Sequence, residues 1–458
     1  MRSLSRWSLL IMILISSGAA QGAKPAAIRL GAGPHLFIDD FLIAKQSGVK
    51  RIVNQPARLP KPVVTGAEDK CFQPYMTILR DPRTKRFRIW YGVPESENQS
   101  HVGYMESKDG IDWIRPHRVL EDPGFIQFGV SIIDSGLDYP NPARRYKYGW
   151  YSPEGGLKIA TSSDGLTWRL LTDEPVVRHN HDINSIHWDP IRKRYIAIVS
   201  FYEEGEGWTG RRRHPYESVS EDLVNWRKPW PIITPDDKDE GETQFYAMSG
   251  LIARGDLLIG LLKVLRDDLP ADPDGPVKGI GYTVLAWSRD GEHWERYREP
   301  FLPRNPEPGT WDHAMTWGDY QLITGDATYI YYGGYARGHK VERFTERQIG
   351  LARMKRDRYV SRSAGNKECH LQTHKLVLSG AAMTLNVNAA GGLARVQILG
   401  ADGKPIKGFS FADCEPITSD SICVPVRWKR ALSAIAGKPV WLEFSLLNAH
   451  LYGFDLTK

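Results

Sequence analysis

Short apolar and aromatic runs recur along this chain, and each of them follows a polar turn. Residues 87–91, 146–151, 257–264 and 328–335 are such runs, and Asp-Pro, Asn-Pro or Gly-Asp dipeptides precede them by a few residues. Runs of this length bounded by turn-forming residues are typical of β-strands. Long amphipathic helical stretches are hard to find, so the pattern predicts an all-β protein.

A second motif repeats between these runs. The sequence SKDGIDW (107–113) returns as SSDGLTW (162–168) and SRDGEHW (288–294), with a looser copy, SEDLVNW, at 220–226. The tryptophans lie 55, 58 and 68 residues apart, which is the size of one supersecondary unit. Ser and Asp side chains bond the local backbone and Gly supplies a positive φ, so each motif predicts a turn between two strands. Trp then packs on a neighbouring sheet, and we expect these residues to hold the units together.

The repeats predict a five-bladed β-propeller over residues 34–362. A fifth unit ends near residues 350–359, with Tyr359 in place of Trp. The strand near residues 36–43 remains, and we expect it to pair with the last blade and close the ring, with Asp39 and Asp40 protecting its edge. From residue 370 to 458 the pattern changes to apolar runs separated by turns such as Gly391-Gly392, which predicts a C-terminal β-sandwich.

Composition supports short strands and gives no sign of a nucleic-acid surface. The 458 residues include 43 Gly and 30 Pro, and the formal net charge of +6 is small for this length. Residues 1–23 resemble a signal peptide, because two arginines precede a short apolar run and small residues follow it. That run is too short to span a bilayer, so a secreted or periplasmic protein without membrane contact is predicted.

The four cysteines, Cys71, Cys369, Cys414 and Cys423, are too few for a disulfide scaffold and form no Cys-x-x-Cys motif. Cys414 and Cys423 are close enough in sequence to pair, and free thiols are an equal alternative. Neither a metal nor a cofactor is expected, since the two-residue spacing of His179 and His181 is weak support for a metal site.

Chemistry is expected where the inner strands of the propeller begin, because loops at one end of these strands form a funnel. Converging carboxyl groups have pKa values that are pushed apart, as acid and base catalysis of glycoside cleavage requires. The candidate catalytic residues are the acids at these positions: Glu68, Asp69, Asp182, Glu242 and Asp312. The candidate substrate-binding residues are nearby aromatic, polar and cationic side chains: His181, Asn184, Arg213, Gln244, Tyr246, Trp311 and His339.

The repeated turns, these acids and the trailing sandwich resemble the five-bladed glycosidases. These are the invertases, fructanases and levansucrases, with the arabinanases and β-xylosidases (glycoside hydrolase families 32, 68 and 43). The resemblance is closest to the invertase type and implies a secreted glycosidase acting on an oligo- or polysaccharide. It also implies, by position, that Asp69 or Glu68 is nucleophile or base, Asp182 a stabiliser and Glu242 the acid. The chain has no Asn-Asp-Pro-Asn element and no Glu-Cys pair, which favours a divergent family within the superfamily.

Three other functions are compatible with the sequence. A non-catalytic carbohydrate-binding propeller would keep the aromatic residues without needing several acids. A sialidase-like exo-glycosidase would use an arginine cluster and a tyrosine nucleophile, for which Arg213 and Tyr216 are available. A phosphorylase would need a basic phosphate site and an intracellular location, and the leader counts against it. The sequence does not specify the sugar, the linkage, the stereochemical outcome or the oligomeric state.

Overall fold

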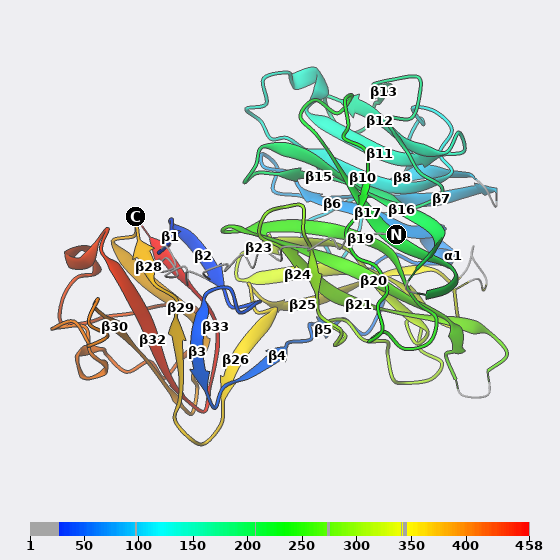
Figure 1. The fold of residues 1–458 in the computed structure, drawn as a ribbon. Helices are drawn as coiled ribbons and strands as arrows, with labels where there is room; N and C mark the ends of the chain where they lie inside the picture. Colours follow the sequence, from blue (N-terminus) through cyan, green and yellow to red (C-terminus); the bar gives the residue numbers. More distant parts are fainter. Residues whose placement is uncertain are drawn as a thin grey trace, which may run out of the picture.

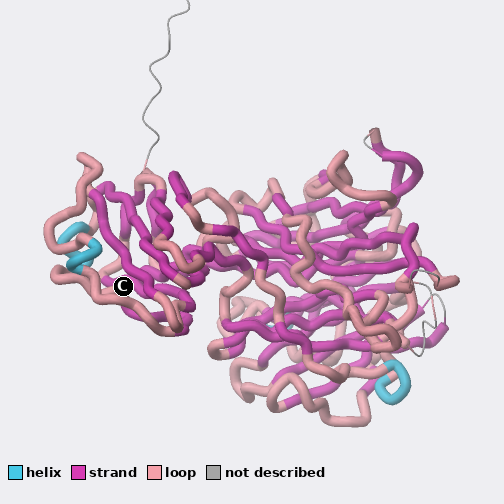
Figure 2. Tube along the Cα trace, turned by 90° about the horizontal axis from the view of Figure 1, so that it is seen from below, coloured by secondary structure: helices cyan, strands magenta, loops and turns pink. Residues whose placement is uncertain are grey.

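The computed structural model describes residues 27–96, 99–206, 208–272, 275–339, 341 and 346–457, and this part of the chain is almost entirely β. Its one α-helix, α1 (Gly66–Asp69), is a single turn. Figure 1 shows two lobes, a larger one with strands β5 to β25 and a smaller one with β1 to β4 and β26 to β33. Strands run through both lobes in Figure 2, and helical turns lie at their margins. The predicted signal peptide falls outside the described residues, among which no helix is long and apolar enough to cross a membrane.

The larger lobe consists of five units of four strands, built by antiparallel pairing. The first unit is β6 (Gln73–Arg80), β7 (Phe87–Ser96), β8 (Gln99–Ser107) and β9 (Arg118–Val119). The second is β10 (Phe128–Asp134), β11 (Tyr146–Ser152), β12 (Gly156–Ser162) and β13 (Arg169–Leu170), with β14 (Val177–Arg178) also beside β12. The third is β15 (Asn184–Asp189), β16 (Arg194–Gly205), β17 (Trp208–Ser220) and β18 (Trp230–Pro231).

The fourth unit is β19 (Thr243–Arg254), β20 (Leu257–Pro270), β21 (Lys278–Ser288) and β22 (Glu295–Arg296). The fifth is β23 (Met315–Thr324), β24 (Ala327–Tyr335), β25 (Gln348–Lys355) and β5 (Ala57–Arg58). A single parallel bridge from Gly281 to Met315 joins the fourth and fifth units.

The first strands of the units contact one another in the cyclic order β6, β10, β15, β19, β23 and back to β6. All five line one cavity of about 150 Å³, which we call the channel cavity. The larger lobe is therefore propeller-like, with these five strands on the inside.

The repeated turns connect neighbouring units, as the sequence predicted. Gly110, Gly165 and Gly291 have φ values of 79°, 77° and 72°. Their carbonyl oxygens accept hydrogen bonds from Tyr331, Trp90 and Arg194, each at 2.8 Å and each from the preceding unit of the ring. In the looser copy, Leu223 takes the same left-handed conformation, at φ 71°.

The strand near residues 36–43, which we expected to pair with the last unit, does not pair with it. Strand β5 pairs with β25 instead, while β2 (Gly33–Leu36) pairs with β33 (Ala449–Thr457) and β3 (Ile43–Ser47) with β27 (Cys369–Thr373). Residues 34–53, which the sequence assigned to the propeller, thus belong to the smaller lobe. The reason is burial, since Phe37 is fully buried there and packs against Phe444 and Phe454.

Asp39 and Asp40 lie where the two lobes meet. Asp39 accepts two hydrogen bonds from Arg289 of the larger lobe, at 2.7 and 2.8 Å. Asp40 pairs with Arg362 at 2.7 Å. Asp39 thus fastens the lobes to each other, whereas the Asp40 pair lies within the smaller lobe, and the predicted role of both on a closing strand was wrong.

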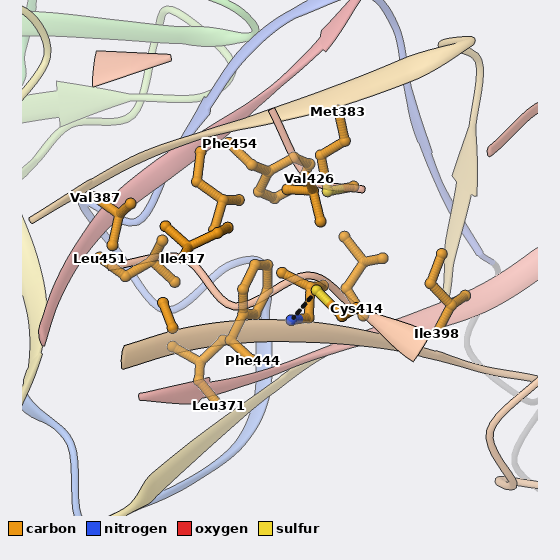
Figure 3. Close-up of a cluster of buried hydrophobic side chains, with 14 of the residues drawn as sticks. Leu371, Met383, Val387, Ile398, Cys414, Ile417, Val426, Phe444, Leu451 and Phe454 are labelled. Atoms are coloured by element: carbon orange, nitrogen blue, oxygen red, sulfur yellow. Dashed lines mark hydrogen bonds between the residues drawn. The ribbon is translucent and has the colours of Figure 1, made fainter. Parts of the chain in front are cut away.

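The smaller lobe contains two six-stranded sheets that bury one hydrophobic cluster between them. One sheet holds β3, β27, β1 (Ile28–Leu30), β28 (Leu376–Leu378), β30 (Leu393–Leu399) and β32 (Pro439–Leu447). The other holds β2, β33, β4 (Lys50–Val53), β26 (Val360–Ala364), β29 (Ala382–Asn388) and β31 (Asp420–Pro425). In Figure 3, Leu371 and Phe444 of the first sheet lie near Leu451 and Phe454 of the second.

All four cysteines are free thiols, so Cys414 and Cys423 are not bonded to each other. Cys414 is buried in the cluster between the sheets, where its sulfur accepts a hydrogen bond from the backbone of Val396 at 3.4 Å (Figure 3). Cys423 is exposed.

Candidate functional site

The candidate site lies where the inner strands begin, at one end of the channel. A layer of buried side chains forms its floor. Each inner strand, or the residue just before it, contributes to this layer: Tyr75, Phe128, Ile183, Tyr246 and Trp317. Polar groups from the third, fourth and fifth units gather beside this layer. We call the following set the mouth network: His181, Asp182, Arg213, Gln244, Tyr246, Asp267 and His339.

Arg213, on β17, is the centre of the mouth network. Its Nε donates to His181 Nε2 at 3.0 Å, and its Nη1 donates to Gln244 Oε1 at 2.8 Å and to Asp267 Oδ2 at 3.4 Å. The guanidinium carbon lies 5.3 Å from the centre of the Tyr246 ring. A planar guanidinium suits this role because its donors point in fixed directions.

Asp182 lies two residues before the start of β15, and its side chain is 24% exposed, so part of it is open to the solvent at the mouth. Burial alone would raise the pKa of its carboxyl group, but His181, Arg213 and His339 outweigh that effect and hold the pKa below the ordinary value. Oδ1 lies 3.0 Å from His181 Nε2, yet has no hydrogen-bond partner among the described residues. Asp182 is therefore an ionised group with an unused acceptor.

Asp267 is the second carboxylate of the mouth network, and its side chain is 31% exposed. Besides Arg213, it meets Gln244 Nε2 at 3.4 Å and His339 Nδ1 at 3.1 Å. Burial lowers the pKa of His339 to about 4, so this imidazole is neutral at neutral pH. Arg213 thus joins both carboxylates into one network.

The floor under these groups is aromatic. Tyr246 stacks on Trp317 with ring centres 4.5 Å apart and an interplanar angle of 23°. His181 and His339 each meet the Tyr246 ring edge-on at 5.2 Å. Burial raises the pKa of the Tyr246 hydroxyl, so it stays protonated at neutral pH. Flat apolar faces beside polar groups are typical of sugar-binding sites.

Glu68 and Asp69 are not part of the mouth network. Asp69 is 1% exposed, pairs with Arg115 Nε at 2.8 Å and accepts a 2.8 Å hydrogen bond from the backbone of Thr65. Glu68 is exposed and lies 3.5 Å from the same guanidinium. Both acids hold α1 and the loop that carries Arg115.

Glu242 also lies apart, since it is exposed and its backbone N–H donates to Asp268. Asp312 is buried and accepts hydrogen bonds from Asn305 Nδ2 at 2.8 Å and from the Tyr332 hydroxyl at 2.9 Å. Trp311 stacks on the same Tyr332 at 5.5 Å. These contacts fasten a loop to β24.

Asn184, the first residue of β15, is 6% exposed, and neither its Nδ2 nor its Oδ1 has a partner among the described residues. It lines the channel cavity below the mouth network.

The features expected of a sialidase are not brought together. The Tyr216 hydroxyl donates to Glu203 and its ring packs on Phe201 at 4.3 Å. Tyr216 is three residues from Arg213 along β17, so the two side chains point to opposite faces of the sheet.

Asp267 and Tyr75 were not predicted. Asp267 stands in the sequence Arg-Asp-Asp at 266–268, at the end of an apolar run, and this was the only signal. No group of three or more His, Cys, Asp or Glu side chains suited to a metal ion occurs in the described ranges.

A hollow larger than the channel cavity, of about 770 Å³, lies elsewhere, between the lobes. Its wall includes Asp39 and Arg289, which pair with each other, and Arg51 and Glu299, which pair at 2.9 Å. We place the candidate site at the mouth instead, because there two partly exposed carboxyl groups, Asp182 and Asp267, meet around Arg213 and His181.

No family model matches the chain. An uncharacterized protein of Mycobacterium tuberculosis is 27% identical over 140 residues, which cover 27% of this chain and 41% of that protein.

Several solved structures are similar in chain path. A Bombyx mori β-fructofuranosidase of family 32 matches 88% of this chain and 94% of its own, with 12% identity and a TM-score of 0.43. The catalytic domain of a Coprinopsis cinerea family 62 α-L-arabinofuranosidase matches 65% of this chain and 96% of its own, with 11% identity and a TM-score of 0.48.

An N-acetylgalactosamine deacetylase from F. plautii, solved with blood group B trisaccharide, matches 68% of this chain and 96% of its own, with 15% identity and a TM-score of 0.44.

Proposed function

We propose that the larger lobe is a five-bladed β-propeller and that the protein is an exported glycoside hydrolase with its active site at the mouth network. The observation that carries this proposal is the pairing of two carboxylates through one guanidinium. Asp182 is ionised and keeps Oδ1 unused, and Arg213 connects it, through His181, to Asp267. Two carboxyl groups beside one sugar ring are the usual requirement for cleaving a glycosidic bond.

Asp182 takes the role of base or nucleophile in this proposal. Its pKa lies below the ordinary value, so it is a carboxylate at neutral pH. Its side chain is open to the mouth, where the sugar would arrive.

Asp267 takes the role of acid. Its Oδ2 has long contacts of 3.4 Å with Arg213 and Gln244, and a leaving oxygen can take the place of these donors. Gln244, His181 and the Tyr246 ring would bind the sugar. These assignments differ from the roles that the invertase-type resemblance implied, since Asp69 and Glu242 lie outside the mouth network.

A carbohydrate-binding propeller is the second candidate. The observation in its favour is that donors already approach both oxygens of Asp267, from His339, Arg213 and Gln244. A site that only binds sugar hydroxyls needs such acceptors and no proton donor.

The test is hydrolysis by the mature protein, from about Gln21, of a panel of aryl glycosides and polysaccharides. Asp182→Asn and Asp267→Asn should each lower kcat/KM by at least about a hundredfold. Glu242→Gln, at an exposed carboxylate near the rim, is the matched control and should stay within about twofold of the parent. Full activity in both aspartate variants would refute the site. Glycan binding without hydrolysis of any substrate would favour the binding propeller.

A further inference from the structure

Three buried polar groups lie at the point where the mouth meets the channel. Asp182 Oδ1 and both amide atoms of Asn184 make no hydrogen bond within the described residues, and the Tyr75 hydroxyl lies beside that of Tyr246. Asn184 and Tyr75 are each 6% exposed. Buried polar atoms are almost always satisfied, so these groups indicate a ligand that can both donate and accept hydrogen bonds.

The three groups belong to one place. Asn184 and Tyr75 both line the channel cavity, and Asp182 precedes Asn184 by two residues on the side of the mouth. Burial raises the pKa of Tyr75, and the neighbouring Tyr246 and the Asp182 carboxylate add to the effect, so this hydroxyl keeps its proton.

The channel cavity has the size and polarity for water. Its volume is about 150 Å³, and its wall includes the buried ion pair of Lys263 with Asp319. A water molecule occupies about 30 Å³ in the liquid and needs two to four polar partners, so the cavity has room for several. The ion pair is internally neutral, and Asp319 also accepts hydrogen bonds from Met76 and Ser249, so nothing here favours a charged ligand.

We infer that Asn184 and Tyr75 hold a water molecule at the top of the channel cavity and present it to Asp182 as the attacking nucleophile. This inference rests on the proposed function. Asn184 Nδ2 donates to the water oxygen, Asn184 Oδ1 accepts one water proton, and Asp182 Oδ1 accepts the other. Asn184 is then a positioning residue, and Asp182 is the base.

The step balances as a direct displacement. The water oxygen forms a bond to the anomeric carbon while its proton passes to Asp182. The bond from that carbon to the leaving oxygen breaks, and the leaving oxygen takes the proton of Asp267, which enters the step as the neutral acid and leaves it as the carboxylate. In this inference the water beside Asn184 and the acid Asp267 act from different sides of the sugar. The inference therefore specifies inversion at the anomeric carbon.

A high-resolution crystal structure of the mature protein is the first test, and it does not depend on activity. An ordered water within hydrogen-bond distance of the Asn184 carboxamide and the Tyr75 hydroxyl is expected. A dry site, or protein partners for these atoms, would overturn the inference.

Kinetics on a hydrolysed substrate are the second test. Asn184→Leu should lower kcat by at least about tenfold with KM nearly unchanged, and Tyr75→Phe, which keeps the ring in the floor, should change kcat in the same direction. Ser131→Ala is the matched control, because Ser131 lines the same cavity but its hydroxyl is bonded to the backbone of Ile186. Equal kcat values in all three variants would contradict the inference.

The anomeric form of the first product, read by ¹H NMR, is the third test. Inversion supports the water as nucleophile, and retention overturns it while leaving the proposed function intact. If no glycoside is hydrolysed, the proposed function fails, and the crystal structure alone decides whether the water site exists.

Discussion

Arg213 Nε donates a hydrogen bond to His181 Nε2 across 3.0 Å. The same nitrogen of His181 lies 3.0 Å from Asp182 Oδ1, and Nδ1 lies 2.9 Å from Ser200 Oγ. Ser200 in turn donates to the backbone oxygen of Tyr246 at 3.2 Å. One imidazole nitrogen thereby connects Arg213 to Asp182.

Arg213→Lys should therefore lower kcat/KM by about ten- to a hundredfold, because an ammonium cannot bond His181, Gln244 and Asp267 from one plane. The ¹⁵N NMR signals of His181 should also shift, because its Nε2 loses the Arg213 contact.

Arg211→Lys is the control for that variant. Arg211 lies on the same strand and stacks on Tyr202 at 4.6 Å, as Arg213 does, but it is exposed and outside the mouth network. Its kcat/KM should stay within about twofold of the parent. Equal losses in both variants would contradict the central position of Arg213.

Asp69→Asn should reduce stability and spare catalysis. The carboxylate is buried against Arg115, and its loss leaves that charge without its nearest partner, which costs about 2 to 3 kcal/mol. Urea unfolding measures this cost. Glu68→Gln, at an exposed acid beside the same arginine, should change the free energy of unfolding by less than about 0.5 kcal/mol. A large fall in kcat/KM for folded Asp69→Asn would restore the role that the family resemblance implied.

Gly165→Ala should weaken the contact between the first and second units. At φ 77° an alanine is strained by about 1 to 2 kcal/mol, and its Cβ would also lie 3.0 Å from the Trp90 ring. Gly391→Ala has the same strain at φ 78° with nothing within 4 Å, so the difference between the two variants isolates the contact with Trp90. Thermal unfolding should show the larger loss for Gly165→Ala, and equal losses would mean that the contact contributes nothing.

Acid should destabilise the protein through His179. Burial lowers the pKa of this histidine to about 4, against about 6.5 in an unfolded chain. Between these values the unfolded chain binds a proton that the folded protein does not. The stability that the neutral imidazole provides is thus complete above pH 6.5 and is lost as the pH falls toward 4.

For this one group the loss from pH 8 to pH 5 amounts to about 2 kcal/mol of unfolding free energy. His179→Gln should remove that part of the pH dependence, as measured by urea unfolding at the two pH values. An unchanged difference between pH 8 and pH 5 would show that His179 is not a source of it.

The mouth network could be predicted in part, because the propeller topology brings the starts of the inner strands together. Once the repeats place the inner strands in a ring, the residues that start them must meet, and this brought His181, Asp182, Gln244 and Tyr246 to one place. Asp267 could not be predicted. It and Asp268 are adjacent acids at the end of β20, and the register irregularity after Arg266 decides which one faces the mouth.

The acids outside the mouth network also could not be told apart from Asp182 by their local sequence. Asp69, Glu242 and Asp312 also lie near the starts of inner strands, and nothing local distinguishes them from Asp182. Asp69 is turned inward by Arg115, which is 46 residues further along the chain, and Asp312 by Tyr332 on a neighbouring strand. Such partners become visible only when the chain is folded.

By itself, the sequence determined the β-rich class, the repeated turns and their glycines, because these depend on contacts within a few residues. The tertiary structure alone decided that residues 28–53 complete both sheets of the smaller lobe, that β5 pairs with β25, and that Asp267 joins Asp182. Each of these relationships links residues far apart in the chain, and it is burial and pairing in the folded protein that select among the possible partners.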